Sequence, residues 1–172
     1  MPDPNQLAAQ GKFAFENKQF AAAAELFRRA ADEFTAARQE LMAAEMMNNL
    51  SVAYLQAGQA AEALTAALGT DRIFEQAKDL KRQGMALGNQ AAALEGLSRN
   101  DEAIAAYERS AELFARAGEG DLQAMVMKSA AAIKLKTGRL TDSAFKMIGS
   151  LDVKDNPGFL ERILKFLLRF IK

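Results

Sequence analysis

The chain has 172 residues, half of them hydrophobic and about a quarter charged, and its formal net charge is zero. This balance is typical of a soluble protein with a real core, and it gives no reason to expect a nucleic-acid partner. The absence of cysteine and histidine excludes disulfides, thiolate nucleophiles, the usual zinc ligands and the commonest general base. We expect neither a signal peptide nor a membrane-spanning segment, and we therefore expect a cytoplasmic protein.

From the N-terminus onward, the chain repeats with a period of forty residues. Prolines occur only at positions 2, 4 and 157, which leaves the residues between free to form helices. Small residues, which allow close helix crossings, recur at Gly11, Ser51, Ala91 and Ala131, and again at Ala23, Ala63, Ala103 and Ser143. Large residues expected in the core recur at Leu7, Met47, Leu87 and Met127, and at Phe34, Phe74 and Phe114.

Each repeat contains one position that suits a turn between two helices. These positions are Lys18, Gly58, Ser98 and Gly138, where glycine favours a positive φ at a helix end. Asn100 and Thr141 are then expected to be N-caps of the following helices. The pattern predicts helix–turn–helix units near residues 1–40, 41–80, 81–120 and 121–150, stacked as an all-α array.

Two stretches carry a resemblance to a known family: "NNLSVAYLQAGQAAEAL" at 48–64 and "SRNDEAIAAYERSAELF" at 98–114. A small–small–aromatic–small order falls on Gly11, Ala23, Phe27 and Ala30 in the first unit, and on Ala91, Ala103, Tyr107 and Ser110 in the third. This order resembles the tetratricopeptide repeat over about residues 4–150, and the long period resembles the branch found in kinesin light chain and LGN-type polarity adaptors. The resemblance implies a right-handed superhelical solenoid. Gln10 and Gln90 depart from it, since they stand where the family usually has leucine.

The resemblance also implies that the first helix of each unit lines a concave groove for a peptide or a helix. The residues expected to line this groove are Asn5, Lys12, Phe15, Asn48, Asn49, Val52, Leu55, Met85, Asn89, Glu95, Met125, Lys128, Ser129 and Leu135. Asn49 and Asn89 are one period apart, and an amide can both donate to and accept from a peptide backbone. The alternative is that these amides cap or bridge neighbouring helices. Met47 and Met127 are expected in the core, whereas Met85 and Met125 either line the groove or pack inside.

The sequence contains no catalytic constellation, phosphate loop or dinucleotide fingerprint. The stretch "DVKDNPG" at 152–158 has Lys154 and Pro157 where a calcium loop needs an oxygen ligand and glycine. We therefore expect a non-enzymatic interaction scaffold without cofactor or metal, the competing class being a small enzyme.

After a linker at 151–156, the chain ends in "PGFLERILKFLLRFIK", for which we expect an amphipathic helix over 157–172. On a helical wheel, one arc of roughly 200° holds the large apolar residues Phe159, Leu160, Ile163, Leu164, Phe166, Leu167, Leu168, Phe170 and Ile171. The opposite arc holds Glu161, Arg162, Lys165, Arg169 and Lys172. Such a helix is about 24 Å long, too short to cross a bilayer core of about 30 Å.

A helix that only capped the array would need a narrower apolar stripe of about 100–140°. We therefore expect this segment to dock on a membrane surface or a protein partner, with a second copy and a purely intramolecular cap as alternatives.

Overall fold

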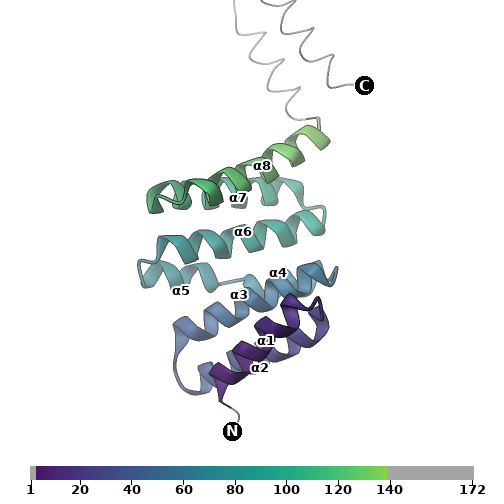
Figure 1. Cartoon of the computed structure of the whole chain (residues 1–172). Coiled ribbons are helices and arrows are strands. Elements are labelled where there is room, and N and C mark those ends of the chain that lie inside the picture. The colour runs from purple at the N-terminus through teal and green to yellow at the C-terminus, as the bar shows by residue number, and fades with distance from the viewer. Residues whose placement is uncertain (1–2, 139–172) are drawn as a thin grey trace, which may run out of the picture. The chain divides into compact units, whose positions relative to one another are not determined.

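The computed structural model describes residues 3–138, and the expectations that concern residues 139–172 lie outside this range. Helices and short turns make up the described part of the chain (Figure 1). The helices are α1 (Pro4–Glu16), α2 (Phe20–Ala36), α3 (Glu40–Gln56), α4 (Ala60–Ala67), α5 (Thr70–Gln76), α6 (Leu80–Gly96), α7 (Asn100–Ala117) and α8 (Gly120–Lys136). Residues up to Ile133 belong to one compact unit, and a second unit begins at Lys134.

The helices pack as sequential antiparallel pairs, so the expected all-α class and hairpin arrangement are confirmed. The first pair is α1 with α2, the second is α3 with the two segments α4 and α5, and the third is α6 with α7. The forty-residue period is visible in the helix starts, because α3, α6 and α8 begin at residues 40, 80 and 120. The second helices of the three pairs begin at residues 20, 60 and 100.

The predicted turn positions have the predicted backbone conformation. Lys18, Gly58, Ser98 and Gly138 all have φ between 59° and 76°. At Lys18 the turn is a Schellman motif: Gln19 N donates to Ala14 O at 2.9 Å, and Lys18 N donates to Phe15 O at 2.9 Å. The sequence analysis missed a second set of left-handed residues between successive pairs, at Arg38, Lys78 and Gly118.

The expected N-cap at Asn100 is wrong. Asn100 is the first residue of α7, and Arg99 occupies the N-cap position without a side-chain cap bond. The reason is the preceding Schellman turn, in which Arg99 N donates to Leu94 O at 2.9 Å, so that the helix starts directly after it. A true cap occurs at Asp79, whose Oδ1 accepts from Arg82 N at 2.9 Å. This hydrogen bond is the main reason that the pKa of Asp79 lies below its ordinary value.

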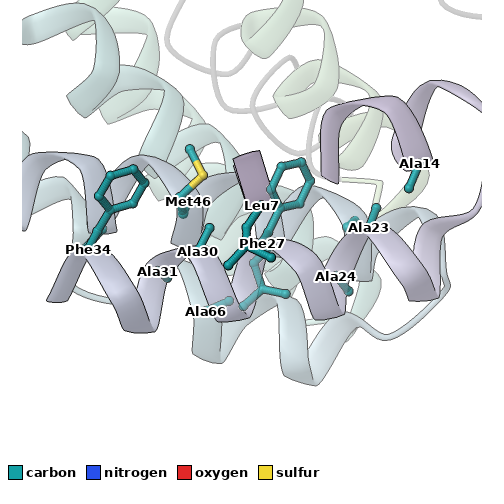
Figure 2. Close-up of a cluster of buried hydrophobic side chains, with 13 residues drawn as sticks. Leu7, Ala14, Ala23, Ala24, Phe27, Ala30, Ala31, Phe34, Met46 and Ala66 are labelled. Atoms are coloured by element: carbon teal, nitrogen blue, oxygen red, sulfur yellow. The ribbon is translucent and has the colours of Figure 1, made fainter. Parts of the chain in front are cut away.

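The repeated aromatic and alanine positions form the core. Phe34, Phe74 and Phe114 are almost completely buried, as predicted, and so are the three alanines Ala23, Ala63 and Ala103. The small residues allow close approach: a Cβ added to Gly11 would lie 2.8 Å from the Phe27 ring. Figure 2 shows the cluster around Phe27, Phe34 and Met46, formed by side chains of α1, α2, α3 and α4.

Two expectations for α8 are wrong, that of Met127 in the core and that of Ala131 at a close helix crossing. Met127 is 54% exposed, because Val126, Ala130 and Ile133 form the buried side of α8 and Met127 projects to a different side of the helix. Ala131 is also exposed. In α3, Met46 is fully buried, whereas Met47 is half-buried at the edge of the core.

The second helix of the middle pair is broken between α4 and α5. Gly69 has φ 83°, a left-handed conformation that breaks the helix. The Thr70 hydroxyl hydrogen-bonds the Ala67 carbonyl oxygen at 2.7 Å and the Asn48 side-chain oxygen at 2.9 Å. The side-chain amide of Gln90, a residue of α6, donates a hydrogen bond to the same Ala67 oxygen at 3.0 Å. This contact explains why glutamine stands where leucine was expected.

Gln10, the other departure, is explained differently. It is exposed on α1, whereas the residue one period later, Leu50, is buried in α3. The side of α3 that carries Leu50 packs against neighbouring helices, but the matching side of α1 is in solvent within the described unit. A polar residue is therefore suited to position 10.

Candidate functional site

The first helices α1 and α3 bring four of the expected groove residues together, Lys12, Phe15, Asn49 and Val52. These residues surround a hollow of about 150 Å³, together with Glu16 and the edge of Phe27. Lys12 is exposed, while Asn49 and Val52 are half-buried. The hollow thus offers a cation and an amide above an apolar base, a combination suited to a peptide backbone with an apolar or acidic side chain.

Asn48 does not belong to this surface, and its assignment to the groove is wrong. Its side chain is 7% exposed and contacts the Thr70 hydroxyl at 2.9 Å. Since a buried amide without hydrogen bonds is costly, Asn48 is committed to holding α3 against the start of α5. The helix-bridging alternative therefore applies to Asn48.

Asn49 and Asn89 are in a different situation. Both are half-buried, and they occupy equivalent positions of α3 and α6. Over residues 3–138, neither side chain forms a hydrogen bond with the protein, in contrast to Asn48 and Gln90. Their donors and acceptors are available to a ligand.

In α6 and α8 the expected groove residues become more apolar. Met85 and Met125, also one period apart, are 44% and 59% exposed. The two helices lie close together here, since a Cβ added to Gly88 would be 3.7 Å from Val126 Cγ1. The Met side chains are thus solvent-facing, and they can adapt their shape to an apolar ligand.

The remaining expected residues surround these methionines or lie farther along the helices. Lys128 and Leu135 are exposed, and Ser129 is half-buried, with its hydroxyl donating to Met125 O at 3.4 Å. Glu95 is exposed and accepts a 3.0 Å hydrogen bond from the Tyr107 hydroxyl. Burial raises the pKa of Tyr107 far above its ordinary value, and the Glu95 charge acts in the same direction, so the phenol remains a donor.

A basic side chain ties the two central first helices together. Arg82 of α6 bonds to Asp79 at 2.7 Å and approaches Glu45 of α3 at 3.4 Å. Its guanidinium also lies 5.3 Å from the centre of the Phe74 ring. The Glu45 contact joins α6 to α3, and the Phe74 contact joins α6 to α5.

The sequence analysis missed one prominent exposed aromatic. Phe13 of α1 is 68% exposed, although the equivalent residues Ala53 and Ala93 are fully buried. The sequence contained a sign of this exposure, because a large aromatic stands where the later repeats have a buried alanine. In the described unit, no other hairpin packs against this side of α1.

Comparison with protein-family models gives no match, and neither does comparison with curated proteins. Within residues 3–138, no group of three or more acidic side chains is placed to hold a metal ion. Over the same range, no helix has both the length and the apolar character that a bilayer crossing requires.

Proposed function

We propose that this chain is a non-enzymatic scaffold of the tetratricopeptide type, whose first helices bind an extended peptide or a helix of a protein partner. In this proposal, the hairpins continue through residue 150 as a right-handed solenoid. Its support is the forty-residue spacing of the helix starts, the repeated Phe34, Phe74 and Phe114, and the left-handed turns. All of these make successive hairpins equivalent, and equivalent hairpins place their first helices side by side.

The observation that carries the proposal is the contrast among the three asparagines. Asn48 is buried and hydrogen-bonded, whereas Asn49 and Asn89 keep their amides available one repeat apart. Two such amides can each pair with a peptide unit of an extended ligand whatever its side chains are. The hollow at Lys12 and Val52 then supplies the neighbouring side-chain contact.

A selection from a random-peptide display library against the full chain tests this function. The Asn49→Ala/Asn89→Ala double variant should bind the selected peptide about 1–3 kcal/mol more weakly, because each neutral hydrogen bond contributes about 0.5–1.5 kcal/mol. Thermal melts of the double variant should be nearly unchanged, since neither amide is bonded to another of residues 3–138.

Asn48→Ala is the matched control. It should lower the free energy of unfolding by about 1–3 kcal/mol, since it leaves a buried hydroxyl with one partner fewer. Peptide affinity of the folded variant should be unchanged. If the double variant is strongly destabilised while its folded form binds the peptide with unchanged affinity, Asn49 and Asn89 are structural and the proposal is wrong.

A second proposed role concerns residues 157–172, which lie outside the described range. We propose that they attach the scaffold to a membrane surface or to a partner protein. In this proposal, the chain itself is cytoplasmic and peripherally bound. The support is the sequence: a wide apolar arc opposite Arg162, Lys165 and Arg169. Leu164→Glu should abolish attachment, and vesicle flotation at low and high salt separates the membrane from a protein. If truncation after Lys154 only destabilises the repeats, the segment is a cap.

A further inference from the structure

The second helices carry two grooves that are equivalent by the forty-residue period. One, here called the α2–α4 groove, has a volume of about 510 Å³ and a floor that includes Met47, Leu50 and Tyr54 of α3. The other, the α4–α7 groove, has a volume of about 350 Å³, and its floor includes Leu87 and Leu94 of α6, forty residues after Met47 and Tyr54. Both grooves are apolar at the base and open to solvent.

The charges around the two grooves are opposite. Beside the α2–α4 groove, Arg28 is shared by Glu25 at 2.8 Å and Asp32 at 3.2 Å. Glu62, on the other wall, forms no ion pair among residues 3–138. Three carboxylates thus face one guanidinium, and the groove has an acidic rim.

The α4–α7 groove has an excess of positive charge. Arg99 pairs with Glu102 at 2.6 Å, and Arg109 on the same rim forms no ion pair within the described residues. A ligand with an apolar face and basic flanks is therefore attracted to the α2–α4 groove and repelled by its counterpart.

We propose that the α2–α4 groove binds residues 157–172 of a second copy of this chain. The segment ends the chain 34 residues beyond the described part, and it supplies large aliphatic and aromatic side chains for the apolar floor. Residues 154–172 carry five basic and two acidic side chains, which complements the acidic rim. This inference rests on the proposed attachment role of residues 157–172 and names their partner.

The test is sedimentation velocity of the full chain over a range of concentrations, at low and high salt. Reversible self-association is expected, and it should weaken at high salt because the rim charges are exposed and screened. Thr65→Trp, which fills the groove from α4, should abolish association. Glu62→Lys, at an exposed site, should raise the dissociation constant roughly tenfold.

The equivalent groove supplies matched controls. Ala105→Trp and Glu102→Lys make the same changes forty residues later and should leave association unchanged. A chain that is monomeric at every concentration, or controls that weaken association as much as the test variants, would overturn the inference. A monomer that still floats with vesicles refutes this inference and leaves the attachment role standing. A monomer that does not float, and whose truncation after Lys154 only destabilises the repeats, refutes both.

Discussion

The second helices of the middle and third hairpins have the same place in the repeat but different continuity. Both have an alanine at the close crossing, Ala63 and Ala103, and both have a buried phenylalanine near the end. Yet the middle one is divided into α4 and α5, while α7 runs unbroken from Asn100 to Ala117. The repeated core positions therefore fix where a helix packs without fixing whether it is continuous.

Continuity is decided by the residues between these anchors. Where α7 has Tyr107 and Arg109, the middle hairpin has Ala67 and Gly69. Ala67 supplies no aromatic ring to the core, and Gly69 permits the left-handed conformation at low cost. The polar contacts of Thr70, Asn48 and Gln90 then stabilise the break.

The largest expected effect tests what the two hairpins share. Phe74→Ala and Phe114→Ala should each lower the free energy of unfolding by about 3–5 kcal/mol, because each ring is fully buried. Urea denaturation of both variants provides the measurement. A silent Phe74→Ala beside a damaging Phe114→Ala would mean that the break has uncoupled the middle hairpin from the core.

The shared alanines give a smaller effect. Ala63→Leu and Ala103→Leu should each cost about 1–3 kcal/mol, since a larger side chain must fit into a crossing with no free surface. Thermal melts of the two variants should shift similarly. Unchanged melting temperatures would show that Ala63 and Ala103 do not lie at close helix crossings.

Gln90→Leu tests what is special to the break. Leucine is buried at the equivalent position, Leu50, yet here it should destabilise by about 1–3 kcal/mol because the Ala67 carbonyl and Asp71 lose a donor. Equilibrium unfolding in denaturant measures the difference. A stabilised Gln90→Leu protein would show that these hydrogen bonds matter less than apolar burial.

The smallest expected effect is at the glycine itself. Gly69→Ala should cost about 1 kcal/mol, because φ 83° is unfavourable for alanine although space is open around the site. Gly120→Ala, also in open space but at the start of a regular helix, should instead stabilise by about 0.4–1 kcal/mol. Differential scanning calorimetry measures both changes. If the two variants shift the melting temperature in the same direction, the backbone strain assigned to position 69 is contradicted.

Sequence periodicity could predict the hairpins, the phenylalanine core and the first set of turns, since these depend on positions that recur. It could not predict the break, because a single glycine in a helical pattern is common and the stabilising contacts come from residues about twenty positions away. Nor could it separate Asn48 from Asn49, adjacent residues that point about 100° apart on α3. Which of them is buried follows from the position of Thr70. Nor could it predict that Met127 is exposed, because Val126, Ala130 and Ile133 alone form the buried side of α8 within the described residues, at the repeat positions of Met46, Leu50 and Ala53.

The central claim is that the first helices bind the partner. Hydrogen–deuterium exchange of the full chain, with and without a peptide selected from a random library, tests it most directly. The claim predicts slower exchange in α1, α3 and α6, with the largest change around Asn49 and Asn89 and little change in α2 and α7. Protection confined to α2, α4 and α7 would contradict it, because the peptide would then occupy the second helices.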